Sequence, residues 1–150
     1  MTEPVQPLAG RGRRLAATLV DALLVPALAL VLVMATGAVE DPEDYRNFAF
    51  LRTVLALAVL SYLILNGYLL WKRGQTLGKR LLSIAIVSHA TGARAPLWRL
   101  VFVRALFFPL LYLIVSPTLA LLPVIDQLAI FGKRRRCVHD YVAGTSVIRL

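Results

Sequence analysis

The sequence predicts an all-α membrane protein, a small polytopic helix bundle with two spanning helices and a third apolar region that is broken by prolines or folded as a hairpin. A short cytoplasmic pairing of two β-strands is also predicted. Three apolar runs, at 15–38, 53–71 and 105–125, are each close to the ~20 residues that cross a ~30 Å hydrocarbon layer as a helix. Hydrophobic residues make up 59% of the chain and the mean hydropathy is +0.73, well above the range of soluble domains. The basic residues gather beside the apolar runs.

The first helix is predicted at about 15–38, after a cytoplasmic tail at 1–12 and at the start of a transmembrane domain that covers 13–150. Asp21 is the only charged residue in this run. Signal peptides have apolar cores of roughly 7–15 residues, and this run is longer and contains an acid. We therefore expect an uncleaved spanning helix.

The second helix is predicted at about 50–71, and the charges on either side of it give the orientation. Four acids and two arginines lie between the first two apolar runs, whereas seven lysines and arginines and no acid lie at 72–104. The positive-inside rule places the 72–104 segment and the N-terminus in the cytoplasm. The two helices thus form a hairpin that crosses outward and back.

The third apolar region, at about 104–131, precedes a basic cluster at 133–136 that the same rule places in the cytoplasm. One crossing would put this cluster outside, whereas two short crossings or a re-entrant hairpin would return it. Pro109, Pro117 and Pro123 provide the breaks. Runs rich in β-branched residues predict strands at 84–89 and 145–149, and their pairing also needs a cytoplasmic tail.

Catalytic, metal and cofactor sites are not expected. The single cysteine, Cys137, excludes an intrachain disulfide and a CxxC pair, and the segment GQTLGK lacks the glycine spacing of a P-loop. His139 and Asp140 are adjacent, so in a strand they would point to opposite faces. The net charge of +9 lies mostly beside the spans, which favours anionic lipid headgroups over nucleic acid as the partner.

Three segments carry a resemblance to a known family. RRLAATLVDALLV, RGQTLGKRLLSIAIV and CVHDYVAGTSVI together resemble the RDD family of small bacterial membrane proteins, over residues 13–149. That family is named for one arginine at the start of the first helix and two aspartates in or beside the membrane. Arg14 and Asp21 match the first two. Asp126 is the first choice for the second aspartate, and Asp140 is the other candidate. The resemblance implies a multi-pass protein of the bacterial cytoplasmic membrane with a transport role such as cation/proton exchange.

The charged residues of the predicted spans also favour transport. Arg14 and Asp21 lie on nearly the same helix face, roughly 10.5 Å apart along the axis, too far for a direct pair. Arg104 and Asp126 provide one further charge of each sign. If Asp21 and Asp126 converge, a desolvated pair of carboxylates would bind protons tightly and exchange them for Na⁺ or Li⁺. Neutral oxygen ligands would come from Thr18, Tyr62 and Asn66.

An alternative hypothesis assigns these charges a structural role. Buried arginines and aspartates would then pair to fix helix register, in a non-enzymatic membrane scaffold or assembly partner whose basic cytoplasmic face docks another protein. Because three or four helices hardly enclose a transport path, the transport hypothesis also predicts a homo-oligomer.

Overall fold

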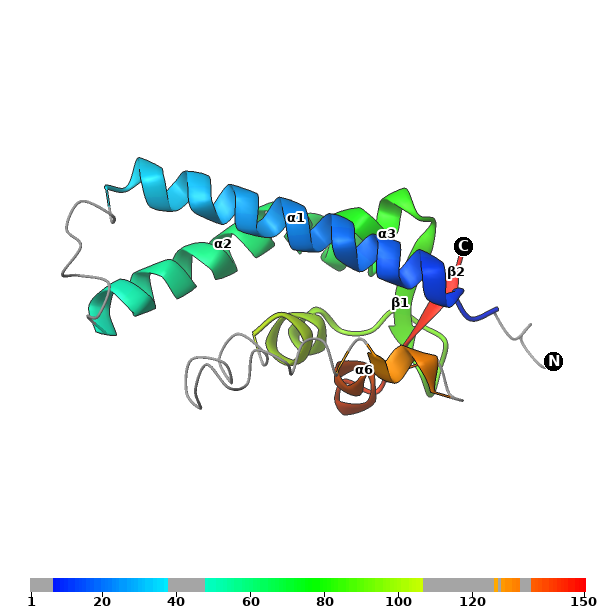
Figure 1. Cartoon of the computed structure of the whole chain (residues 1–150). Coiled ribbons are helices and arrows are strands. Elements are labelled where there is room, and N and C mark those ends of the chain that lie inside the picture. Colours follow the sequence, from blue (N-terminus) through cyan, green and yellow to red (C-terminus); the bar gives the residue numbers. More distant parts are fainter. Residues whose placement is uncertain (1–6, 38–47, 107–125, 127, 133–135) are drawn as a thin grey trace.

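The computed structural model describes residues 7–37, 48–106, 126, 128–132 and 136–150 (Figure 1). Most of the third apolar region, with Pro109, Pro117 and Pro123, lies outside the described residues. The described elements, in chain order, are α1 (Arg11–Ala35), α2 (Phe48–Arg73), α3 (Leu77–Leu81), β1 (Ile84–Ser88), the π-helix η2 (Arg99–Leu106), the 3-10 helix η4 (Ala129–Phe131), α6 (Val138–Val142) and β2 (Thr145–Arg149).

The helices α1 and α2 lie side by side as a long hairpin (Figure 1). Both are long and apolar enough to cross a membrane. Their apolar side chains are exposed along much of their length: Leu23 is 72% exposed and Phe48 is 78% exposed. An amphipathic helix of a soluble domain buries its apolar stripe, so this exposure fits a lipid-facing surface. Lys72 and Arg73 end α2, where cations complement the helix dipole.

The two strands form an antiparallel sheet with Ile84 opposite Arg149 and Ser88 opposite Thr145. This pairing confirms the sheet predicted from the β-branched runs. Residues before α1 extend it, because the Ala9 N–H donates to the Val147 carbonyl at 3.0 Å. The N-terminal segment, the segment after α2 and the end of the chain therefore meet at one end of the hairpin (Figure 1).

A tight connection leads from α2 to the sheet and sets the position of α3. Gly74 has φ +62°, and a Cβ there would lie 2.7 Å from the Ile86 carbonyl oxygen, so only glycine fits. The Gln75 side chain donates to the Ile84 carbonyl at 2.9 Å. Thr76 then caps α3 by accepting a hydrogen bond from the Lys79 N–H at 3.3 Å. These contacts fix the start of α3 relative to α2 and β1.

Candidate functional site

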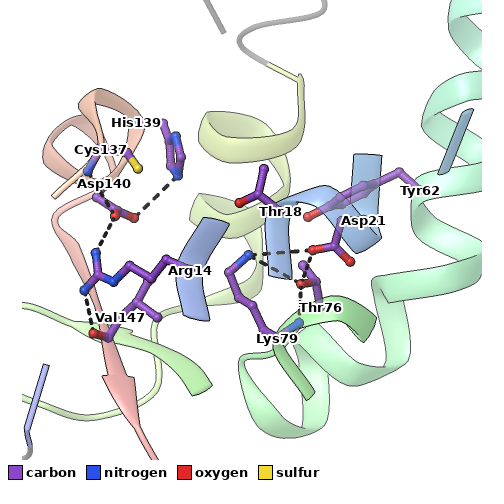
Figure 2. Close-up of a pocket in the computed structure, with 10 residues that line it drawn as sticks. All are labelled: Arg14, Thr18, Asp21, Tyr62, Thr76, Lys79, Cys137, His139, Asp140 and Val147. Atoms are coloured by element: carbon purple, nitrogen blue, oxygen red, sulfur yellow. Dashed lines mark hydrogen bonds and ion pairs between the residues drawn. The ribbon is translucent and has the colours of Figure 1, made fainter. Parts of the chain in front are cut away.

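A cavity of about 140 Å³ lies where α1, α2 and α3 meet α6 and β2 (Figure 2). Its walls carry two basic and two acidic side chains, an imidazole, a thiol and three hydroxyls, with one apolar residue. The residues are Arg14, Thr18, Asp21, Tyr62, Thr76, Lys79, Cys137, His139, Asp140 and Val147. Figure 2 shows two acidic centres, Asp21 and Asp140, on different sides of this space.

The Asp21 carboxylate is held by residues of the segment that begins α3. Thr76 Oγ1 donates to Oδ2 at 2.5 Å, and the Gly78 N–H donates to Oδ1 at 2.8 Å. The Lys79 ammonium lies 3.8 Å from Oδ2. The side chains of Asp21 and Lys79 are 16% and 12% exposed, so this ion pair is largely shielded from solvent. Charge-assisted hydrogen bonds of this kind are stronger than neutral ones.

The approach of α3 to α1 depends on Gly78. A Cβ at this position would overlap the carbonyl oxygen of Ala17 and lie 3.0 Å from Asp21 Oδ1. Asn66 on α2 supports the same approach, because its amide oxygen accepts from the Leu77 N–H at 2.8 Å. The hydrogen bond from the Gly78 N–H to Asp21 is thus a direct consequence of close packing between α1 and α3.

The second acidic centre joins α1 to the C-terminal part of the chain. Arg14 donates to the Val147 carbonyl at 2.6 Å and lies 3.7 Å from the Asp140 carboxylate. The Thr145 hydroxyl donates to Asp140 at 3.2 Å, and the Cys137 N–H donates at 3.3 Å. Arg14 is 4% exposed and Asp140 1%. This is a buried ion pair with further hydrogen bonds to its acid, the condition under which burial of charge is tolerated.

His139 lies between two carboxylates. Its backbone N–H donates to Asp126 Oδ1 at 2.8 Å, and its Nδ1 shares a hydrogen bond of 2.5 Å with Asp126 Oδ2. Its Nε2 faces Asp140 Oδ1 at 3.6 Å. The expectation that His139 and Asp140 point to opposite faces of a strand is wrong, because 138–142 is the short helix α6. Both side chains therefore line the same cavity.

The structure brings most of the candidates from the sequence to this cavity: Arg14, Thr18, Asp21, Tyr62 and Asp140. Asp126 reaches the same region through His139. Asn66 contributes a structural hydrogen bond to α3. Arg104 belongs to η2, and its side chain lies outside the described residues. The ion-pair partners that the structure gives to Arg14 and Asp21 are Asp140 and Lys79.

Thr76, Gly78 and Lys79 are site residues that the sequence did not indicate. Their segment, GQTLGK, lacks the glycine spacing of a phosphate-binding loop. A signal was present in the threonine that precedes LGKR, because a threonine before a helical turn is a typical N-cap.

A comparison with models of protein families gives a match over most of the chain. The model of the RDD family matches residues 8–144, which covers nearly the whole chain and both acidic centres. No protein with a curated description and no solved structure matches.

Proposed function

This chain belongs to the RDD family, and on that premise we propose that it is a small transporter that exchanges a monovalent cation, Na⁺ or Li⁺, for a proton at Asp21. The family match and the two apolar helices support a location in a membrane. The observation that carries the proposal is the position of Asp21. Its carboxylate lies within the apolar helix α1 and lines a polar cavity beside Lys79. An ionisable residue in a spanning helix is a functional candidate.

The cavity offers the ligands that a small hard cation prefers. Hard cations are bound by oxygen atoms, and Asp21 shares the cavity with the hydroxyls of Thr18, Tyr62 and Thr76. A cation that binds Asp21 takes the place of the Lys79 ammonium, and a proton that binds Asp21 neutralises the same carboxylate. Cation and proton thus occupy one site in turn, which is the requirement for exchange. The proposed exchange involves no enzymatic reaction.

The proposed topology places both termini in the cytoplasm of a bacterium and has the third apolar region enter the membrane and return to the same side. The hydrogen bonds from Ala9 to Val147 and from Arg149 to Pro7 support a common location for both ends of the chain. At the cavity end of α2, the Lys72 ammonium lies 4.7 Å from the centroid of the Trp71 ring. Tryptophan and lysine at a helix end fit an anchor at anionic lipid headgroups.

Asp140 is the better candidate for the second aspartate of the family motif. It shares the cavity with Arg14 and Asp21 and forms the ion pair with Arg14. Asp126 contacts His139. We therefore assign cation and proton binding to Asp21, and the positioning of α1 to Arg14 and Asp140.

Asp21→Asn is expected to abolish cation-driven proton flux while the protein still folds. Asparagine keeps the side-chain size but cannot exchange a cation for a proton. The measurement is flux in proteoliposomes that contain a pH-sensitive dye, challenged with Na⁺, Li⁺ and K⁺ at matched protein density. Flux that persists at the wild-type rate would contradict the proposal. No flux from folded wild-type protein would favour the scaffold alternative.

Lys79→Gln is expected to lower the half-saturating Na⁺ concentration, because it removes the ammonium that competes for Asp21. The expected change is roughly fivefold, corresponding to the ~1 kcal/mol of a partly shielded ion pair. Arg80→Gln is the matched control, since Arg80 is the next residue and is exposed. An equal shift in both variants would mean that the effect is one of surface charge. The same preparations, analysed by native mass spectrometry, test the proposed homo-oligomer.

A further inference from the structure

We propose that Asp126, Cys137 and His139 form a binding site for a divalent transition metal ion of the zinc class. One ligand atom from each of these residues can be chosen so that all three lie within 4.8 Å of one another. A thiolate, an imidazole and a carboxylate are all donors that Zn²⁺ accepts. Sequence spacing gives no sign of the cluster, because Asp126 is eleven residues before Cys137 and reaches it only through the fold.

The start of α6 aligns the three donors. Cys137 precedes the helix in an extended conformation, and His139 lies in its first turn. The His139 N–H holds Asp126 Oδ1 at 2.8 Å, which turns Oδ2 toward the imidazole. A metal ion would replace the proton shared by His139 Nδ1 and Asp126 Oδ2 and the proton of the Cys137 thiol. The thiol proton leaves to solvent, whereas a neutral imidazole keeps its one ring proton, which moves from Nδ1 to Nε2, so that His139 binds the metal as an uncharged ligand.

The charges of the cluster match a divalent ion. Asp126 is 3% exposed and Cys137 is 5% exposed. The carboxylate and the thiolate together carry two negative charges, so a divalent cation leaves no net charge buried at this point. The sulfur donor also discriminates among cations. Thiolates favour Zn²⁺ and related transition metals, whereas Na⁺, Mg²⁺ and Ca²⁺ prefer oxygen.

The surroundings provide an outer shell and an open position. His139 Nε2 faces Asp140 Oδ1 at 3.6 Å, and Asp140 in turn contacts Arg14 and Thr145. A metal-bound histidine commonly directs its second ring N–H to a carboxylate, which fixes the ring. Three protein ligands leave one tetrahedral position for water or another small ligand. Cys137 and His139 line the cavity, so that position is accessible from it.

The test is titration of the full-length, tag-free protein in detergent with Co²⁺, followed by absorption. The chain has a single cysteine, so a thiolate-to-cobalt charge-transfer band reports on Cys137 alone. We expect one Co²⁺ per chain, displaced by Zn²⁺ and unaffected by Mg²⁺. The band is expected to disappear in Cys137→Ser.

Two matched pairs of variants identify the other ligands. His139→Gln and Asp126→Asn are expected to weaken Co²⁺ binding by more than the ~10–100-fold that loss of an outer-shell partner costs. His89→Gln changes the only other histidine, and Asp21→Asn changes the acid assigned to cation exchange. Both are expected to retain the band at wild-type affinity. Retention in Asp21→Asn, which lacks exchange, would also separate metal binding from the proposed transport.

Absence of the band from folded wild-type protein would overturn the proposal, as would equal binding by His139→Gln and His89→Gln. If His139→Gln or Asp126→Asn does not fold, Cys137→Ser decides the question. This change replaces sulfur by oxygen at one atom, and a folded Cys137→Ser protein with unaltered Zn²⁺ affinity by calorimetry would exclude the site.

Discussion

Gly78→Ala is expected to lower the free energy of unfolding by ~3 kcal/mol or more, the upper range for overpacking a close contact. The added methyl group would overlap the Ala17 carbonyl oxygen and approach the carbonyl carbon to 3.1 Å. These are backbone atoms of α1, so they cannot move away by a change of rotamer. The helices α1 and α3 would have to separate, and the hydrogen bond from the Gly78 N–H to Asp21 would be lost.

Gly67→Ala is the matched control for this substitution. Gly67 lies within α2, and a Cβ there meets nothing within 4 Å. Alanine in a helix interior is more favourable than glycine by up to ~1 kcal/mol, so Gly67→Ala is expected to be neutral or stabilising. Denaturant titration in mixed micelles, followed by far-ultraviolet circular dichroism, measures both. Equal stability of the two variants would mean that α1 and α3 do not approach as closely as described.

The long elements were predictable from the sequence because they depend on composition over many residues. The apolar runs predicted both helices of the hairpin, although α1 begins at Arg11 and ends at Ala35 rather than at 15–38. The β-branched residues of the two strands predicted their pairing, and the charge pattern predicted that both strands lie on the same side of the membrane.

The short helices were not predictable in the same way. Both α3 and α6 have five residues, too few for a periodic signal. The start of α6 has Asp140 accepting from the Cys137 N–H, whereas the usual capping box has serine or threonine followed by glutamate or glutamine. Cysteine and aspartate in these positions give a weaker pattern, so the sequence does not predict a helix at His139 and Asp140.

The partners of the charged residues depend on these same short helices. Asp21 meets Lys79 because α3 packs on α1 through Gly78, and Arg14 meets Asp140 because α6 and β2 fold back onto the start of α1. Neither contact follows from spacing along the chain. The sequence therefore indicated Arg14, Asp21 and Asp140 as candidates but not the ion-pair partners that the structure gives them.

Asp140→Asn is expected to lower the free energy of unfolding by ~3–5 kcal/mol, the cost of removing one partner from a buried ion pair. Asparagine has nearly the same shape, so packing is retained while the Arg14 guanidinium, 4% exposed, loses a compensating charge. Arg14→Gln is expected to have an effect of similar size. Arg13→Gln is the matched control, since Arg13 is the preceding residue and is partly exposed; its effect is expected to stay within ~0.5 kcal/mol.

A double-mutant cycle tests whether Arg14 and Asp140 act as a pair. The combined variant is expected to lose ~1–3 kcal/mol less stability than the sum of the single variants, the usual coupling of residues in contact. Additive losses would mean that each residue stabilises the fold through other contacts, such as the Val147 carbonyl for Arg14 and Thr145 for Asp140.

The same variants separate a structural role from a transport role within the family motif. If Asp140 positions α1, flux per folded protein in Asp140→Asn should remain near the wild-type value while stability falls. Asp21→Asn should show the reverse, with flux lost and the folded fraction preserved, because Asp21 is less buried. The amide oxygen of asparagine can accept from the Gly78 N–H, and the Thr76 hydroxyl, which donates to the other oxygen of Asp21, can accept from the amide NH₂ group instead. Loss of flux in fully folded Asp140→Asn would instead assign both aspartates to ion handling.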